Sequence, residues 1–342
     1  MGVKIFDILR PKSITWKELE GKTLAVDASL YLHQFLASIR QRDGTPLTDS
    51  KGRTTSHLVG LFSRTAQWLE RGIKPIYVFD GKPPELKEKV REERRVIKEE
   101  AKEKYRQAVV KGNIEEMKKY ASRTSILTKE IVSEAKELLQ AMGVPTVQAP
   151  SEAEAQAAYM TIKGDAWAVA SQDSDAILFG AERLVRNLAI SGKKKKAGKL
   201  SYENITPEIY HAKDVLNNLG IDREQLIALS ILVGTDYEPA GIKGIGSKTA
   251  LKLVKENGKN FEELFKKAEW EKHSKTPWKE IMNTFKNIPV TTDYTTQPKS
   301  ANAKKIMEIL VQEHEFSKER VEETITKIGK TTSQQGLAQF FR

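Results

Sequence analysis

The stretch Thr23-Leu24-Ala25-Val26-Asp27 is a short apolar run that ends in a carboxylate, and the same form recurs twice later in the chain. Residues 76–79 are apolar and precede Asp80, and residues 167–170 come shortly before Asp173. Short apolar runs of this kind are typical of buried strands. Because ligands of an open parallel sheet bind beyond the carboxyl ends of its strands, these acids are expected to meet in one crevice.

Strand-like and helix-like segments alternate along the chain. Strand-like runs cover residues 23–28, 75–79, 143–147, 166–170, 176–179 and 184–190. Helix-like runs cover residues 29–40, 55–71 and 128–142, and the pattern is mainly helical from residue 206 onward. This order predicts an α/β fold with a mostly parallel central sheet flanked by helices and a helical C-terminal part.

The composition limits the classes of function. The 342 residues include 57 Lys and Arg against 46 Asp and Glu, a formal charge of +11, and no cysteine. The positive charge suits a polyanionic partner, although it serves solubility equally well. The lack of cysteine excludes disulfides, thiolate-bound zinc and cysteine nucleophiles. Because no apolar run has transmembrane length and residues 1–10 do not resemble a signal peptide, we expect a soluble intracellular protein without membrane contact.

Four further acids complete the set: Glu152 and Glu154 where a helix is expected to begin, Asp175 two residues after Asp173, and Asp236 at a break after an apolar helix. Ser151 is the expected N-cap of the helix that carries Glu152 and Glu154, and both acids face the site only if that helix begins there. Asp173 and Asp175 point to the same side if their segment is extended. Any one acid could be a helix cap or a salt-bridge partner. The full set of seven better fits two divalent cations, Mg²⁺ or Mn²⁺, that promote phosphodiester hydrolysis.

Residues 82–130 differ from their surroundings in charge and in apolar content. They contain 15 Lys and Arg against 10 Glu, and the apolar residues of 83–110 recur at the spacing of one helix face. This segment has too few apolar residues for a normal core helix, so we expect a long helix that projects from the body. A solvated helix with ion pairs between successive turns is the alternative interpretation.

A glycine-rich turn precedes a helical run at residues 250–255. Gly241, Gly244 and Gly246 let the backbone approach a phosphate closely, and the amide groups at the helix start can donate hydrogen bonds to it. Positive charge comes from Lys243, Lys248 and Lys252. The turn therefore predicts a clamp on the DNA backbone, with a plain helix-loop-helix turn as the alternative.

The C-terminal tail, expected to be flexible from residue 331, has a regular motif. Gln334 and Leu337 are followed by Phe340 and Phe341, and one helical turn would gather the apolar members on one side. This motif resembles the peptide that docks on sliding clamps of the PCNA type. A tail folded onto its own core is the alternative.

Five motifs in order resemble those of the flap endonucleases of the XPG family. They occupy residues 26–29, 77–84, 149–156, 171–175 and 234–237. An uninterrupted set is far more specific than any single motif. The resemblance implies a structure-specific 5′ nuclease that removes 5′ flaps during replication, including Okazaki fragment processing, and during repair, with 5′–3′ exonuclease activity.

The resemblance also implies roles for individual residues. One metal ion would be served mainly by Asp27, Asp80, Glu152 and Glu154, and the other mainly by Asp173, Asp175 and Asp236. Residues 82–130 would form a helical arch through or under which a single-stranded 5′ end passes. Lys87 and Arg94 match arch-base cations that contact the scissile phosphate, and they join Asp175 as expected catalytic residues.

Further DNA contacts are expected at the first helix and at the glycine-rich turn. His33 stands where eukaryotic relatives have a tyrosine that stacks on a base, although it is equally well explained as a half-buried helix histidine. Arg40 is another expected contact. The resemblance adds a monovalent cation such as K⁺ and helix-hairpin-helix-type duplex binding at the turn.

The expected domain organisation is one nuclease domain over residues 1–330 and a clamp-binding tail over 331–342. The domain would comprise residues 1–81, the arch at 82–130, a part at 131–258 with the DNA grip at 234–256, and a helical part at 259–330. The expected partners are branched DNA with a 5′ flap and a sliding clamp, with the protein otherwise monomeric. A 5′ exonuclease, a nuclease for bubbles, and a non-catalytic clamp-tethered scaffold are the alternatives.

Overall fold

A seven-stranded sheet forms the centre of the computed structural model, which describes residues 2–121, 126–188, 193–195, 202–204 and 206–340. The sheet order is β1-β9-β6-β5-β2-β3-β4. Its strands are β1 (Lys12–Ser13), β2 (Thr23–Asp27), β3 (Lys74–Phe79), β4 (Thr146–Gln148), β5 (Ala168–Ala170), β6 (Arg183–Arg186) and β9 (Glu208–His211). β4, β3, β2, β5 and β6 pair in parallel, whereas β9 is antiparallel to both β6 and β1. The prediction of a mostly parallel α/β sheet is confirmed.

The strand order changes direction between β2 and β5. From β2 the chain adds β3 and then β4 on one side, and β5 and β6 extend the sheet on the other side. Such a switch point leaves a crevice at the carboxyl ends of the two central strands, because the connections on either side run away from each other. The last residue of β2, Asp27, lies at this crevice.

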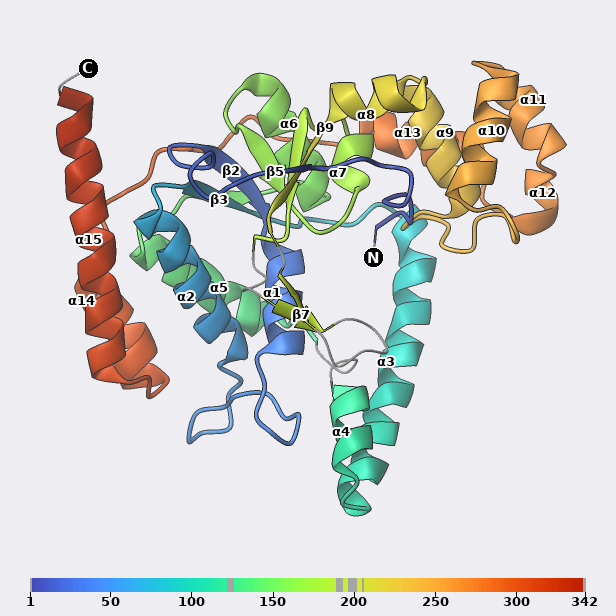
Figure 1. The fold of residues 1–342 in the computed structure, drawn as a ribbon. Helices are drawn as coiled ribbons and strands as arrows, with labels where there is room; N and C mark the ends of the chain where they lie inside the picture. The colour runs from blue at the N-terminus through green and yellow to red at the C-terminus, as the bar shows by residue number, and fades with distance from the viewer. Residues whose placement is uncertain (1, 122–125, 189–192, 196–201, 205, 341–342) are drawn as a thin grey trace.

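Helices cover both faces of the sheet (Figure 1). One core contains Leu24 and Val26 of β2, and the other contains Ala25, because successive strand residues point to opposite faces. The first core is covered by α1 (Ala28–Ser38), α2 (Ser56–Glu70), α5 (Lys129–Ala141), α14 (Ala303–Met307), the π-helical η1 (Glu308–Glu313) and α15 (Lys318–Phe340). The second is covered by α6 (Ala153–Lys163), α7 (Asp175–Leu178), α8 (Ala212–Leu219), α9 (Arg223–Val233), α10 (Ser247–Asn257), α11 (Phe261–Lys267), α12 (Trp270–His273) and α13 (Trp278–Asn287).

The charged segment forms a helical hairpin that projects from the body, as predicted (Figure 1). It consists of α3 (Leu86–Val110) and α4 (Ile114–Ala121), and we call it the arch. Val90, Ala101 and Ala108 are buried, whereas Ile97 is 61% exposed and Val110 is 88% exposed. The arch is therefore held by a narrow stripe of mostly small side chains.

Several predicted elements differ from the structure. Residues 176–179 were expected to be a strand, but most of them belong to α7, because a short apolar run fits a buried helix turn as well as a strand. β9 lies where a mainly helical pattern was expected. The basic run at residues 191–199 predicts an exposed turn, but residues 193–195 form β7 and pair with β8 (Tyr202–Asn204). The rest of this run lies outside the described residues.

The C-terminal segment also differs from expectation. The backbone of α15 remains helical through residue 340, where a flexible tail from residue 331 was expected. Earlier in this helix, Val321 and Ile328 are buried in the core beside α2. Within the part of the chain that the structure describes, no helix is both long and apolar enough to span a bilayer.

Candidate active site

The acids that end β2 and β3 are fixed by the starts of two helices. Asp27 caps α1, because its Oδ1 accepts a hydrogen bond from the amide of Leu30 at 3.0 Å. Asp80 follows β3, and its Oδ1 accepts from the amide of Ala153 at 2.8 Å. This second bond ties the end of β3 to the first residue of α6. The two acids thus stand at the same edge of the sheet.

Glu152 occupies the N-cap position of α6, one residue after the expected cap Ser151. Its side chain makes no capping hydrogen bond, and its Oε2 instead accepts from Nζ of Lys87 at 2.5 Å. Glu154, on the first turn, accepts from Oγ of Ser171 at 3.1 Å. The helix does begin beside both acids, as their placement required, but the prediction that Ser151 is its cap is wrong.

The remaining acids come from α7 and from the break after α9. Asp175 is the first residue of α7 rather than part of an extended segment. Asp236 comes two residues after Gly234, which has a φ of +111°, a backbone conformation that favours glycine. A Cβ at position 234 would lie only 2.6 Å from the carbonyl oxygen of Pro239, so this tight turn requires glycine. This turn brings Asp236 toward Arg94, whose Nη2 donates to its Oδ1 at 2.8 Å.

Burial and mutual repulsion raise the pKa of several of these acids. Burial is the main cause for Asp27 and Glu154, whose pKa values lie well above normal, and the neighbouring acids raise them further. Burial and the charge of Asp236 raise the pKa of Asp175 to about 7. Burial also raises the pKa of Glu152, although Lys87 opposes it. These interactions link the acids into one electrostatic cluster that gains stability from nearby positive charge.

The arch supplies part of that positive charge. Nζ of Lys87 lies 2.5 Å from Glu152 and 3.4 Å from Asp236. Burial opposes ionisation of Asp236, but positive neighbours that include Lys87 and Arg94 lower its pKa. Burial likewise opposes the charge on Lys87, but Glu152 and Asp236 raise its pKa, so the ammonium stays protonated. Lys87 and Arg94 are therefore brought to the acid cluster, about two helix turns apart from each other along α3.

The donor set of the cluster fits divalent metal ions. All seven predicted ligands are carboxylates, and hard oxygen donors of this kind prefer Mg²⁺ or Mn²⁺. Asp27, Glu152 and Asp175 are buried, whereas Asp80 is exposed, so the cluster is open to solvent on one side. Among the described residues no three donor groups already lie close enough to form one coordination shell. The raised pKa values show that burial and mutual repulsion disfavour the ionised acids, and bound cations would offset both effects.

The N-terminal residues are part of the site, although no motif in the sequence predicts a role for them. The amide of Val3 donates to Oδ1 of Asp175 at 2.8 Å, and Oγ of Ser174 donates to the carbonyl of Val3 at 3.0 Å. A Cβ on Gly2 would lie 2.7 Å from Asp175 Oδ1 and from Asp173 Cβ. Only the smallness of Gly2 hinted at this approach, because nothing local connects residue 3 with residue 175.

His33 and Arg40 lie near the arch, but in different surroundings. Burial lowers the pKa of His33, and the charge of Lys98 lowers it further, so its ring is neutral at pH 7. Arg40 donates to the carbonyls of Ala37 and Gly44 at 3.2 and 2.9 Å and so closes the loop that follows α1. For both residues DNA contact stays a prediction.

The glycine-rich turn leads directly into α10. Gly241 and Gly244 have φ values of +51° and +90°, and Gly246 is the N-cap of α10. The three predicted phosphate-binding lysines are exposed at this turn or on the first turns of α10: Lys243, Lys248 and Lys252. Of the predicted clamp residues, Gln334, Leu337 and Phe340 lie on the last part of α15, and Phe341 lies outside the described residues.

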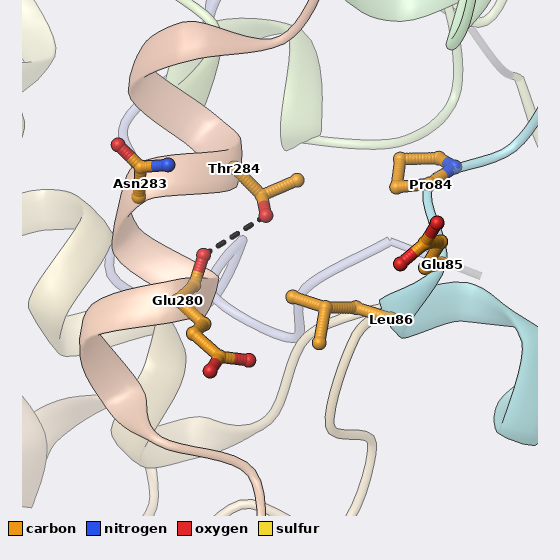
Figure 2. A pocket seen from close by; sticks show the side chains of 6 residues that line it. All are labelled: Pro84, Glu85, Leu86, Glu280, Asn283 and Thr284. Atoms are coloured by element: carbon orange, nitrogen blue, oxygen red, sulfur yellow. Dashed lines mark hydrogen bonds between the residues drawn. The ribbon is translucent and has the colours of Figure 1, made fainter.

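A shallow cavity separates the foot of the arch from α13 (Figure 2). Pro84, Glu85 and Leu86 line one side, and residues of α13 line the other: Glu280, Asn283 and Thr284. None of the seven acids lines it, so it is not the reaction site. Leu86 is half-buried against the core that contains α13, and this contact anchors the residue next to Lys87.

Family models and known relatives match this fold and site. The model of the XPG N-terminal domain matches residues 1–101, and that of the XPG I-region matches residues 143–236. Both regions carry acids of the cluster, so fold and site define a nuclease of the XPG class. Flap endonuclease 1 of Aeropyrum pernix is 50% identical over 96% of this chain and 95% of the relative, and that of Pyrococcus furiosus is 50% identical over 100% of both. The chain belongs to the flap endonuclease family.

A solved structure agrees with this assignment. The flap endonuclease-1 from Methanococcus jannaschii superimposes with a TM-score of 0.77 at 42% identity, over 98% of this chain and 100% of that one. The chain is accordingly a hydrolase that cleaves DNA and depends on metal ions, as is general in this family.

Proposed function

We propose that this protein cuts the phosphodiester at the junction between duplex DNA and a single-stranded 5′ flap, in replication and repair inside the cell. The observation that carries the proposal is the meeting of Lys87 and Arg94 of the arch with Glu152 and Asp236 of the acid cluster. A phosphate in this crevice would meet cationic side chains from one side and the acids from the other. Removal of the 5′ end by 5′–3′ exonuclease action would use the same geometry.

The acids would hold two divalent cations, in the grouping that the family resemblance implies. Asp27, Asp80, Glu152 and Glu154 would serve mainly one ion, and the other would be held mainly by Asp173, Asp175 and Asp236. When bound, such a pair lowers the pKa of a water molecule and neutralises charge on the leaving oxygen. The side chains of the protein would position the phosphodiester between these ions and the arch.

Lys87 and Arg94 would exchange carboxylate partners for phosphate oxygens when DNA binds. Both are pre-positioned on α3, and Lys87 is largely desolvated, so its charge acts strongly on a nearby phosphate. Arg94 can donate two parallel hydrogen bonds to one phosphate. The duplex would be held by the glycine-rich turn and the start of α10, where a K⁺ ion would assist, and the flap by the arch.

The basic test uses a labelled 5′-flap substrate with and without Mg²⁺. We expect a nick at the junction only when the divalent cation is present, and slower cutting of bubbles and blunt duplexes. Binding of the flap without any cut, at all Mg²⁺ and Mn²⁺ concentrations, would favour a non-catalytic scaffold. Preference for bubbles would indicate the related nuclease class.

Replacing Lys87 by alanine is expected to slow flap cleavage about 10²-fold with little change in the Kd of the flap, because one preorganised charge at the scissile phosphate is lost. Single-turnover cleavage and fluorescence anisotropy measure the two quantities. Arg95→Ala is the matched control on the same helix, since Arg95 pairs with Glu92 and Glu99 in solvent. If the Lys87 variant cuts as fast as the control, its assignment fails.

The end of α15 would dock on a sliding clamp of the PCNA type. Deleting residues 334–342 retains the buried Val321 and Ile328, so we expect an unchanged melting temperature and unchanged cleavage without a clamp. Stimulation by the clamp should be lost, because the apolar motif that fills its pocket is gone. A gel-based cleavage assay with and without clamp protein tests this, and a loss of basal cleavage would contradict the model.

A further inference from the structure

The N-terminal segment, residues 2–9, contacts three parts of the molecule that the proposed function uses separately. We infer that this segment, the N-terminal strap, sets the register between the duplex grip and the acid cluster, with Asp7 as its positioning residue. The inference rests on the proposed function. It concerns where the cut falls rather than whether DNA binds.

At its first end the strap is locked to the acid cluster. Val3 and Ile5 are buried, with 2% and 0% of their surface exposed. Val3 makes two hydrogen bonds with the start of α7: its amide donates to Asp175, and its carbonyl accepts from Ser174. Any shift of the strap would therefore move a hydrogen-bond donor of Asp175 and the segment that carries it.

The middle of the strap supports the loop that bears Asp173. The guanidinium of Arg186 lies 3.6 Å from the ring centroid of Phe6, a cation–π contact. Nε of Arg186 donates to the carbonyl of Gln172 at 3.1 Å, immediately before Asp173. Tyr210 packs against Phe6, with the two ring centroids 5.4 Å apart. The strap thus holds Arg186, and Arg186 holds the loop.

At its other end the strap reaches the duplex grip. Oγ of Ser247 donates to Oδ2 of Asp7 at 2.5 Å, across 240 residues of sequence. Ser247 is buried and is the first residue of α10, directly after the N-cap Gly246, which offers no side chain of its own. A carboxylate here also interacts favourably with the helix dipole. This bond fixes the start of the helix that would hold a DNA phosphate.

The strap is short, so its two ends are mechanically linked. Three residues separate Val3 at the acids from Asp7 at the grip, and Ile5 among them is fully buried. A well-packed interior transmits displacement instead of absorbing it. A duplex phosphate held at α10 would therefore be kept at a fixed distance from the acids. Without the bond between Asp7 and Ser247, the duplex could bind equally well but in a less defined register.

The experiment compares Asp7→Ala, Ser247→Ala, the double variant and Asp7→Asn on one end-labelled 5′ flap. We expect Asp7→Ala and Ser247→Ala each to spread the cuts over neighbouring phosphodiesters and to lower kcat about three- to tenfold, the effect of one lost hydrogen bond, with an unchanged Kd. The double variant should match the single ones, because the same contact is lost. Asp7→Asn keeps an acceptor for Ser247 and should cut at the normal position.

The matched control is Asp214→Ala, which breaks another contact of the N-terminal region, the exposed pair of Lys12 with Asp214 at 2.6 Å. It should leave the cleavage position unchanged, and thermal melts of all variants confirm that each is folded. Additive effects of the two single changes would overturn the inference. So would tighter DNA binding with a normal cut site in both Asp7 variants, which would mean that only the charge of Asp7 matters.

The cleavage assay distinguishes a failure of the proposed function from a failure of the inference about the strap. A wild-type protein that leaves every flap intact removes the proposed function and, with it, the inference about the strap. A wild-type protein that cuts at one position, together with variants that cut at the same position and rate, removes the inference about the strap alone.

Discussion

Replacing Asp80 by alanine is expected to lower flap cleavage by at least about 10³-fold while the Kd of the flap stays within about threefold. The reason for the first effect is that Asp80 is the exposed member of the cluster, at the end of β3, where a metal ion and a phosphate would meet. The reason for the second is that phosphate contacts elsewhere supply much of the affinity for DNA.

A second variant separates metal binding from local structure. Asp80 also accepts a hydrogen bond from the amide of Ala153, so alanine removes a charge and a contact together. Asp80→Asn keeps an acceptor for that amide and removes only the charge, and we expect it to be almost as inactive. Asp214→Ala, an exposed acid paired with Lys12, serves as control. Rapid-quench cleavage and anisotropy titration give the two constants, and near-normal cleavage by Asp80→Asn would reject the metal assignment.

Replacing Asp175 by asparagine is expected to abolish cleavage and yet to make the metal-free protein more stable, by about 4 kcal/mol at pH 8. The pKa of this acid is raised to about 7 in the folded state from 3.8, so the folded protein binds its proton more tightly than the unfolded chain does. Between these two values the contribution of Asp175 to stability therefore falls as the pH rises. Asparagine can still accept the hydrogen bond from the Val3 amide, and it carries no charge to repel Asp236.

Urea unfolding in the presence of a chelator measures this effect. The difference in unfolding free energy between Asp175→Asn and wild type should be largest at pH 8 and should shrink as the pH is lowered to 5, where the wild-type carboxyl group is protonated in the folded state. Added Mg²⁺ should narrow the difference at pH 8, because it stabilises the wild-type cluster. A variant that is less stable than wild type at pH 8 would show that repulsion is not the dominant effect at this position.

The parts of the fold that were predictable have strong local patterns. β2 and β3 are apolar runs that end in acids, and the helical face of α3 repeats over many turns, so their type follows from spacing alone. α7 has only four residues, and β9 is stabilised by pairing with β6 and β1, far away in sequence. Short elements of this kind take their conformation from tertiary contacts rather than from their own composition.

The candidate site likewise has a part that could be predicted from local sequence and a part that could not. The acids were recognisable because they follow strands, stand at the start of a helix or lie at the break after one. The hydrogen bonds that orient the acids could not be predicted, because their partners are far apart in the sequence. Lys87 and Glu152 are 65 residues apart, and Val3 and Asp175 are 172 residues apart. The shift of the α6 cap from Ser151 to Glu152 also follows from tertiary structure, because Asp80 supplies the acceptor for the first amide of that helix.

The thin packing of the arch has a consequence for kinetics. The buried residues Val90, Ala101 and Ala108 present little apolar area, whereas the body has a large core on each face of its sheet. The free energy that orders the arch is correspondingly small, so local opening of α3 and α4 costs far less than global unfolding. The arch and the body then act as separate cooperative units. Admission of a flap end would be governed by the opening equilibrium of the hairpin, while the sheet and its acids remain folded throughout.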